Sequence, residues 1–168
     1  MGFRLFCSAV IVSCSALIGL ELRRRLFVRV RSLKYFRDYL RSVRSYISYV
    51  GMSLDDIASE LNSEDVHSEF CSILREKTSY QNFISAFTDT LVITKKSLCI
   101  TDEDFSLLCS VVNKIGASDI DGAIDSLNIA DEQMSALIVS AGKKCETDGK
   151  LCVVLPLSCG AVAALLLM

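Results

Sequence analysis

The chain of 168 residues has room for one domain of about 100 to 150 residues with short appendages, and 51% of its residues are hydrophobic. Its formal net charge of -2 hides two opposite parts, because residues 23–50 carry nine basic residues and one acid, whereas residues 51–148 carry seven basic and 18 acidic residues. An acidic body repels a polyanion, so this division of charge argues against a nucleic-acid-binding protein.

Two apolar segments without an internal charge lie near the ends of the chain, at residues 5–20 and 151–168. Each is close to the lower length limit for a helix that crosses a hydrocarbon core of about 30 Å. The sequence therefore predicts transmembrane helices at residues 1–22 and 151–168, and the adjoining basic residues place residues 23–150 in the cytoplasm. Small-x-x-x-small pairs, which let membrane helices approach closely, occur in both segments: Ser15 with Gly19, and Gly160 with Ala164.

The sequence around Cys14 leaves a second interpretation of the N-terminus open. Residues 11–14, Ile-Val-Ser-Cys, are similar to a bacterial lipoprotein processing site, which would put the helical domain outside the cytoplasm. A cleavable signal carries its charge before the apolar segment, but here only Arg4 precedes it and three arginines follow it at once. We therefore expect a retained membrane anchor.

Residues 23–50 predict one long basic helix, because they lack glycine and proline and their apolar residues recur at spacings of 3 and 4. This apolar seam consists of Leu33, Phe36, Leu40, Val43, Ile47 and Val50. Five basic residues nearest the first apolar segment are expected to face the membrane and its anionic lipid head groups: Arg23, Arg24, Arg25, Arg29 and Arg31. Four that follow are expected to meet acidic neighbours within the bundle or on a partner protein: Lys34, Arg37, Arg41 and Arg44.

Five further helices are predicted after Gly51, at about residues 53–61, 63–77, 79–94, 101–115 and 119–144. Ser53 with Asp56, and Thr101 with Asp104, have the spacing of N-terminal capping sequences. Gly51 and Gly116 are typical of helix ends, and a seam from Ile120 to Ala141 steps by 3 and 4. The sequence thus predicts an all-α protein: a bundle of about six helices flanked by N- and C-terminal transmembrane helices.

No catalytic, cofactor-binding or metal-binding site is predicted. The single histidine, His67, follows Glu64 at the spacing used by di-iron bundles, but such a site needs a second Glu-x-x-His pair. A nucleophile built from His67 and Cys71 would need a third, orienting group, so we interpret His67 as an ordinary helix-surface or core-edge residue. None of the eight cysteines forms a Cys-x-x-Cys pair, so we expect reduced thiols that fill the core.

The order of these features resembles one known family over essentially the whole chain. An apolar span ending at Gly19 and an arginine-rich turn leads into the long amphipathic helix. Much later, residues 115–119, Ile-Gly-Ala-Ser-Asp, precede a further long helix and a hydrophobic tail that passes Gly160 and ends in a leucine run. In these features the chain resembles the stage III sporulation protein AB family. It departs from the family's usual Gly-Gln and Leu-Gly pairs at residues 122–123 and 155–156.

The resemblance implies a non-enzymatic scaffold in the mother-cell membrane facing the forespore, part of the assembly that links the two cells across two membranes. It implies a cytosolic bundle of six helices similar to the platform proteins of type II secretion and type IV pilus systems. The implied partners are other stage III sporulation membrane proteins, including a secretion-type ATPase. No cofactor and no nucleic acid are expected, and a homo-oligomer is left open. The alternative of the same architecture is a general secretion or pilus platform subunit.

Overall fold

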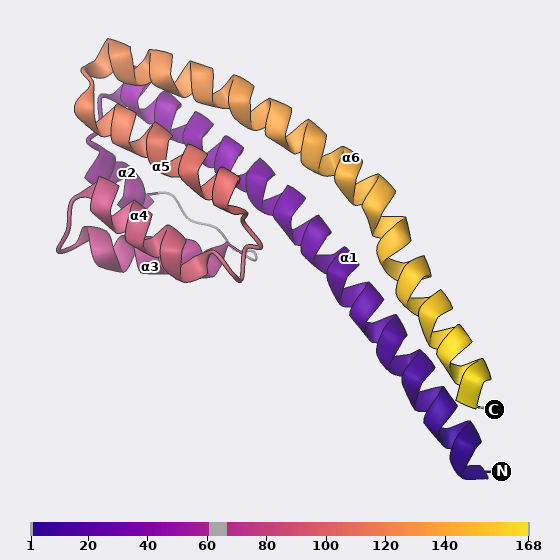
Figure 1. Cartoon of the computed structure of the whole chain (residues 1–168). Helices are drawn as coiled ribbons and strands as arrows, with labels where there is room; N and C mark the ends of the chain where they lie inside the picture. The colour runs from indigo at the N-terminus through magenta and orange to yellow at the C-terminus, as the bar shows by residue number, and fades with distance from the viewer. Residues whose placement is uncertain (1, 61–66, 168) are drawn as a thin grey trace. The chain divides into compact units, whose positions relative to one another are not determined.

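The computed structural model describes the backbone of residues 2–60 and 67–167, and within these ranges it describes side chains except at residues 2–9, 11, 59, 157, 160, 161 and 163–167. Every regular element in the described ranges is helical, which confirms the all-α class (Figure 1). The elements are α1 (Gly2–Ser45), a π-helical turn (Tyr46–Val50), α2 (Leu54–Glu60), α3 (Ser68–Thr78), α4 (Phe83–Thr94), α5 (Asp102–Ala117) and α6 (Ile120–Leu167).

The chain divides into two compact units. The bundle unit is Arg31–Ile138, and the terminal unit consists of Met1–Val30 together with Val139–Met168. The boundaries between the units fall inside α1 and α6, so each of these long helices contributes one part to each unit. The two units are described separately below.

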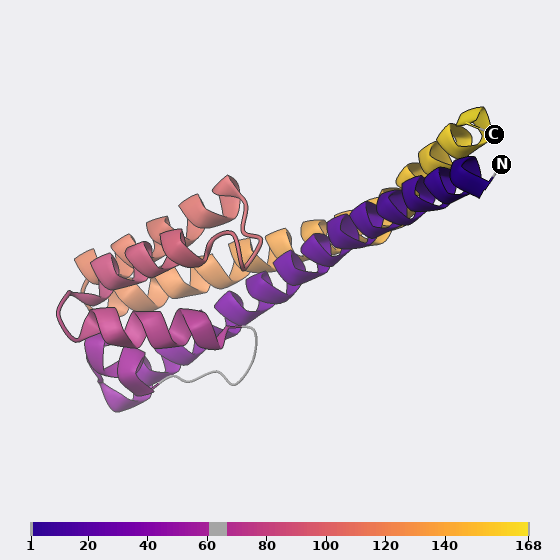
Figure 2. The ribbon, with the colours of Figure 1, turned by 90° about the horizontal axis from the view of Figure 1, so that it is seen from below.

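The core of the bundle unit is an aromatic cluster that joins α1, α3 and α4. The ring centroid of Phe36 lies 5.1 Å from that of Phe70 and 6.3 Å from that of Phe87, and all three rings meet edge to face. This geometry is favourable for aromatic rings beyond the area they bury. Around it, α3 packs on α2 and α4, and α4 packs on α5 (Figure 2).

The apolar seam predicted for the basic helix is confirmed as far as Val43 and wrong at its end. Its first four members, from Leu33 to Val43, are buried in the bundle unit. Ile47 is half-buried and Val50 is 62% exposed. The π-helical turn explains the difference, because Ile47 and Val50 lie within it and its wider i→i+5 turn rotates Val50, its last residue, away from the seam. Gly51, at φ 66°, then ends the helical segment in the left-handed conformation.

The seam of α6 behaves in the same way within the bundle unit. Ala123, Leu127, Ala130 and Met134 are buried, as the spacing predicts, whereas Ile120 at the first position of the helix is exposed. Ile120 is the first residue of α6, so no preceding turn of the same helix packs beside its side chain. The predicted helix from Asp119 is confirmed and continues through Pro156.

Two of the predicted helix starts are confirmed by capping hydrogen bonds. The backbone N–H of Asp56 donates to Ser53 Oγ at 3.3 Å, and Thr101 forms a complete capping box with Asp104 at the start of α5. The fourth helix begins at Phe83 rather than at Ser79, because Asn82 caps it by accepting the backbone N–H of Ser85 at Oδ1. The third helix is described from Ser68 onward, and its predicted start at Ser63 lies outside the described residues.

In the terminal unit, α1 and α6 touch backbone to backbone. A Cβ atom on Gly19 would lie 2.6 Å from the carbonyl oxygen of Cys152 and 3.1 Å from Val153 Cα, so only glycine fits this approach. A Cβ on Gly149 would meet the side chain of Arg23 at 3.7 Å. The two helical segments lie side by side in both ribbon views (Figures 1 and 2).

The structure does not support the transmembrane helices predicted at residues 1–22 and 151–168. Among the residues that were described, no helix holds a stretch long and apolar enough to cross a membrane. The predicted packing residues Gly160 and Ala164 lie outside the described side chains.

Candidate functional site

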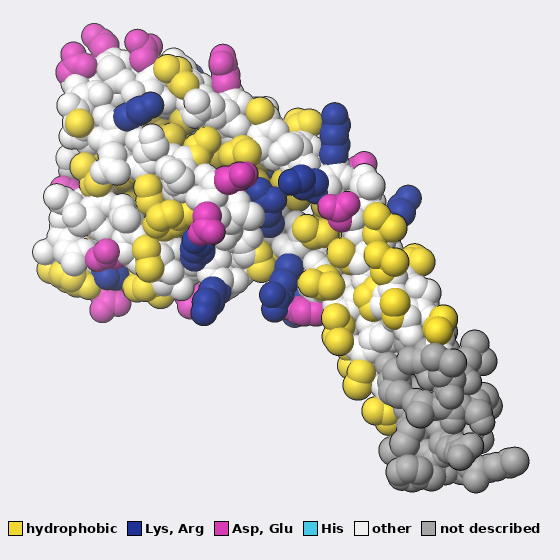
Figure 3. All heavy atoms as spheres, in the orientation of Figure 1, with side chains coloured by type: hydrophobic (Ala, Val, Ile, Leu, Met, Phe, Trp, Pro, Cys, Tyr) yellow, Lys and Arg dark blue, Asp and Glu magenta, His cyan; other side chains and the backbone are white. Residues whose placement is uncertain are grey.

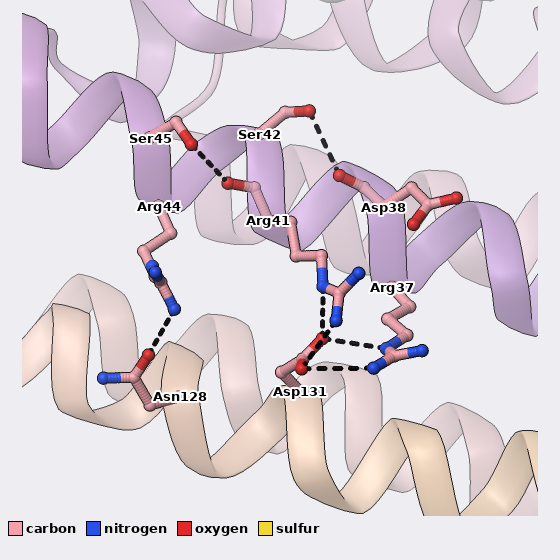
Figure 4. Close-up of polar contacts among 8 residues, drawn as sticks. All are labelled: Arg37, Asp38, Arg41, Ser42, Arg44, Ser45, Asn128 and Asp131. Atoms are coloured by element: carbon pink, nitrogen blue, oxygen red, sulfur yellow. Dashed lines mark hydrogen bonds and ion pairs between the residues drawn. The ribbon is translucent and has the colours of Figure 1, made fainter.

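A polar cluster of the bundle unit joins α1 to α6 through one carboxylate. Arg37 donates from Nε to Asp131 Oδ1 at 2.8 Å and from Nη2 to Oδ2 at 3.3 Å. Arg41 makes the same two hydrogen bonds at 2.6 and 3.0 Å (Figure 4). The two arginines share one face of α1 because they are four residues apart. Each guanidinium therefore binds the same carboxylate through both oxygens.

This arrangement keeps Asp131 ionised. The hydrogen bonds from Arg41 and then from Arg37 hold the pKa of the Asp131 carboxyl well below its usual range. The hydrogen bond to Asp131 in turn raises the pKa of Arg41. Asp131 and Arg37 are each 26% exposed, so this contact is partly shielded from solvent, whereas Arg41 is half exposed. The pairing holds α1 against α6 and leaves one positive charge in excess.

Arg44 continues the cluster along α1 without a carboxylate. Its guanidinium donates a short hydrogen bond to Asn128 Oδ1 on α6 (Figure 4). The hydroxyls of Ser42 and Ser45 donate to the backbone carbonyls of Asp38 and Arg41, each at 3.1 Å, and so bind their own helix. With Asp38 counted, the arginine cluster of Arg37, Arg41 and Arg44 with Asp131 still carries a net positive charge. Lys34, the fourth member of the predicted set, is exposed.

The five basic residues predicted to face a membrane lie along α1. Arg24 and Arg25 pair with Glu21 at 3.9 and 3.3 Å, and the Arg23 guanidinium lies over the ring of Phe27 at 5.6 Å. Arg29 is half-buried and belongs to the terminal unit with these three. The fifth, Arg31, is exposed and begins the bundle unit. Four of the five thus belong to the terminal unit, and the fifth is the first residue of the bundle unit.

Large apolar side chains are exposed along both helices of the terminal unit. Leu17 is 66% exposed on α1 and Val154 is 60% exposed on α6. Figure 3 shows many hydrophobic side chains, with charged ones among them, on the described part of this unit. This exposed apolar surface consists of Val10, Leu17, Ile18, Leu20, Leu22, Phe27, Val139, Leu151, Val154, Leu155 and Val162. A surface of this kind marks contact with a membrane or another protein.

The small residues of the first apolar segment differ in what they touch. Gly19 admits the backbone of α6, as described above. Ser15 donates its hydroxyl to the carbonyl of Val12 at 2.9 Å, and so bonds within its own helix. Cys14, the residue of the lipoprotein interpretation, is an exposed free thiol within α1.

The short motif at residues 116–119 has a packing and a capping role in the bundle unit. A Cβ on Gly116 would overlap the side chain of Ile84, so the glycine lets α5 approach α4. Gly116 lies inside α5, which ends at Ala117, and therefore does not stop the helix as predicted. Asp119 Oδ1 accepts the backbone N–H of Gly122 at 3.0 Å and caps α6.

The histidine is buried rather than at the surface. His67 is 2% exposed and stacks on Tyr35, with ring centroids 4.0 Å apart and planes 6° apart. The Tyr35 hydroxyl lies 2.8 Å from Cys71 Sγ. Burial, followed by the hydrogen bond with Cys71, raises the pKa of Tyr35. Among the described residues no group of His, Cys, Asp and Glu could hold a metal ion, and Glu64 lies outside them.

Residues 4–168 match the model of the family described as stage III sporulation protein AB. The chain belongs to the stage III sporulation protein AB family. Neither a curated protein nor a solved structure matches the chain. Membership of the stage III sporulation protein AB family makes this a sporulation-related protein. The similarity to secretion and pilus platform proteins stays a prediction.

In the bundle unit of this stage III sporulation protein AB family member, the arginine cluster joins α1 to α6. Two guanidiniums hold its carboxylate ionised, with a pKa well below the usual range. Sequence reasoning left open whether Arg37, Arg41 and Arg44 meet the bundle or a partner, and the structure places all three against α6. The shared use of Asp131 has no sequence signal, because the contact spans 94 residues from Arg37.

Proposed function

We propose that this sporulation protein is a non-enzymatic membrane scaffold subunit of the channel or secretion-like complex between mother cell and forespore. Its family supplies the link to sporulation. The exposed apolar surface of the terminal unit is the single observation that carries the membrane part of the proposal. The protein then resides in the mother-cell membrane facing the forespore, with its central domain in the cytoplasm.

The apolar surface favours a lipid environment on energetic grounds. Removing a leucine or valine side chain from water contributes about 1.5 to 3 kcal/mol, and several such side chains are exposed on each helix of the terminal unit. Arg23, Arg24 and Arg25 directly follow the apolar residues of α1 and are exposed. Each basic residue near an anionic lipid surface adds about 1 kcal/mol of attraction. Apolar and basic residues in this order support a membrane-bound terminal unit.

The bundle unit is then available to proteins in the cytoplasm. We propose that its partners are other stage III sporulation membrane proteins, including a secretion-type ATPase. Its helices are fastened to each other by an aromatic core and by the arginine cluster, which suits a rigid support for an assembly. The proposal assigns the unit no reaction of its own.

Deletion of the gene in a sporulating host tests the function. We expect heat-resistant spore counts to fall by orders of magnitude and to be restored by the wild-type gene. A complementing copy with Leu17→Glu and Val154→Glu should leave the membrane fraction and fail to restore spores. Val92→Glu, at an exposed valine of the bundle unit, is the matched control and should complement. Unchanged spore counts after deletion would refute the scaffold role.

The topology is tested separately with a single reporter cysteine in an otherwise cysteine-free chain. Placed at Ser72, which is exposed on α3, it should react with a membrane-impermeant maleimide only after the cells are opened. Labelling of intact cells at Ser72 would place the bundle unit outside the cytoplasm and favour the lipoprotein interpretation.

A further inference from the structure

The end of the basic helix presents an aromatic and basic surface on the bundle unit. A shallow depression of about 400 Å³ is lined by Arg41, Ser42, Ser45, Tyr46, Tyr49 and Val50. Tyr49 is 88% exposed and Val50 is 62% exposed, so an aromatic ring and a neighbouring valine both meet the solvent. The π-helical turn accounts for the exposure of Val50, since it turns this residue away from the buried seam.

A second surface of the same unit is a groove between α5 and α6 with a volume of about 590 Å³. Small side chains line much of it, namely Ser106, Ser110, Ser126 and Ala130, so another chain can approach the two helices closely. Ile129 also lines the groove and is 56% exposed. No residue lines both this α5–α6 groove and the aromatic and basic surface.

The two surfaces carry opposite charge. The aromatic and basic surface includes Arg41, next to Arg44, in a cluster with a net positive charge. One end of the α5–α6 groove is formed by Asp102 and Glu103, both exposed. Two more exposed acids, Asp125 and Glu132, lie one helical turn from Ile129 on α6.

Two lysines partly neutralise the negative charge on the side of the α5–α6 groove. Lys95 pairs with Asp102, and Lys114 also lines the α5–α6 groove. Asp102 and Glu103 line the groove, and the flanking Asp125 and Glu132 bring the acids of this side to four. Four acids against two lysines leave this side negative, with the exposed Glu103 at one end of the groove. Electrostatic complementarity of this kind orients two surfaces and speeds their encounter.

We propose that copies of this chain associate head to tail, with Tyr49 and Val50 of one copy seated in the α5–α6 groove of the next. The arginine side of the first surface then faces the Asp102 and Glu103 end of the groove. Tyrosine and arginine are among the residue types enriched at binding hot spots, and the exposed Ile129 offers them an apolar contact within the largely polar lining of the groove.

The separation of the two surfaces determines the kind of assembly. Because each copy keeps a free surface of the opposite kind after pairing, the contact propagates into a ring or an open row rather than stopping at a symmetric dimer. The charge and the shape of both surfaces come from the chain itself, so a second copy is the occupant that the structure favours.

Photo-crosslinking of the full-length chain in lipid nanodiscs and in host membranes tests this contact. With p-benzoylphenylalanine at Tyr49, irradiation should give a ladder of dimers and larger species, and the crosslinked peptide should fall within residues 102–133 of another copy. The same probe at Tyr80, which is 65% exposed, is the matched control and should give no ladder. A Tyr49 crosslink to another protein, to a different region, or to nothing would overturn the proposal.

Two groove variants give an independent measure. Ser110→Trp fills the groove and Glu103→Lys reverses its acidic end, and each should weaken self-association by about tenfold or more. Ser72→Trp, on an exposed position of α3, should leave it unchanged. Glu103→Lys sits at an exposed position and needs no refolding of the core, so unchanged association in this variant would contradict the proposal. Spore counts after gene deletion test the scaffold role without reference to these variants.

Discussion

Arg41 Nε lies 2.6 Å from Asp131 Oδ1, although 90 residues of sequence separate the two side chains. Arg37 uses the same carboxylate, so removal of Asp131 leaves two guanidiniums without their partner, whereas removal of one arginine leaves a balanced pair. The cluster is therefore more sensitive to a change in its acid than to a change in either base.

Asp131→Asn tests this asymmetry. We expect the free energy of unfolding to fall by about 1 kcal/mol, a value reduced for the partial exposure of the contact. Urea unfolding of the full-length chain in detergent, followed by circular dichroism at neutral pH, measures it. Asp125→Asn, an exposed acid on the same helix, is the control and should change stability by less than about 0.5 kcal/mol. Equal effects of the two variants would contradict a special role for Asp131.

The contribution of Asp131 also depends on pH in a defined direction. Its pKa is lowered in the folded protein, so the stabilisation is present above the ordinary carboxyl pKa of about 3.9 and is lost as the pH falls below it. The difference in stability between wild type and Asp131→Asn should thus be full at pH 6 and shrink in strong acid. Unfolding curves at a series of pH values check this. A difference that grows on acidification would show that the pKa is raised instead.

The arginines of α1 should divide into two functional sets. Arg41→Gln together with Arg44→Gln removes contacts to Asp131 and Asn128 and should weaken assembly while membrane association is kept. Arg24→Gln together with Arg25→Gln removes exposed charge beside the apolar surface and should lower membrane association more than the Arg41 and Arg44 double variant does. Fractionation and co-purification from sporulating cells measure both. Loss of the Arg41 and Arg44 double variant from the membrane would refute the division.

Gly19 should tolerate no side chain. In Gly19→Ala the new Cβ would meet the backbone of Cys152 and Val153, and backbone atoms yield less readily than side chains. We expect a loss of about 1 to 3 kcal/mol, seen as a lower Tm of the full-length chain in detergent. Gly142→Ala, which meets nothing within 4 Å, should be neutral or stabilising by up to about 1 kcal/mol. Equal Tm values for the two variants would mean that the close approach carries no energy.

Gly116 and Ile84 should be coupled. Gly116→Ala should cost about 1 to 3 kcal/mol, because the added methyl group overlaps the isoleucine side chain. Ile84→Val shortens that side chain, so the double variant should be more stable than the sum of the two single changes predicts. Chemical unfolding of the four proteins gives the coupling energy. Strict additivity would show that α5 and α4 relax around the methyl group without using this contact.

The helices and several of their ends could be predicted because they depend on residues close in sequence. Ser53, Thr101 and Gly51 act within one turn of their helix end, and the structure confirms all three. The sequence predicts too early a start for α4, because Asn82 rather than Ser79 caps this helix. Asp55 reinforces the later start, since its Oδ1 accepts the backbone N–H of Phe83 at 2.9 Å. That second contact comes from another helix and has no local signal.

Features that depend on three-dimensional neighbours could not be predicted. The interior role of Gly116 requires Ile84 on another helix, and the burial of His67 requires the ring of Tyr35 on α1. The sharing of the Asp131 carboxylate also has no local sequence signal, although the four-residue spacing of Arg37 and Arg41 puts both on one face of α1. Helical periodicity thus indicates which face of a helix packs against the rest of the protein, whereas the residues that contact this face depend on the tertiary fold.

The π-helical turn at Tyr46–Val50 has a consequence for how the chain tolerates insertions and deletions. A π-turn holds one residue more than the α-turn it replaces, so deleting a single residue from it would let a regular α-helix run to Gly51 while the residues that follow keep their orientation. Tyr49 and Val50 would then still face outward. A return to α-helical hydrogen bonds without a deletion would instead turn Val50 back toward the buried seam and close this helix end to other chains.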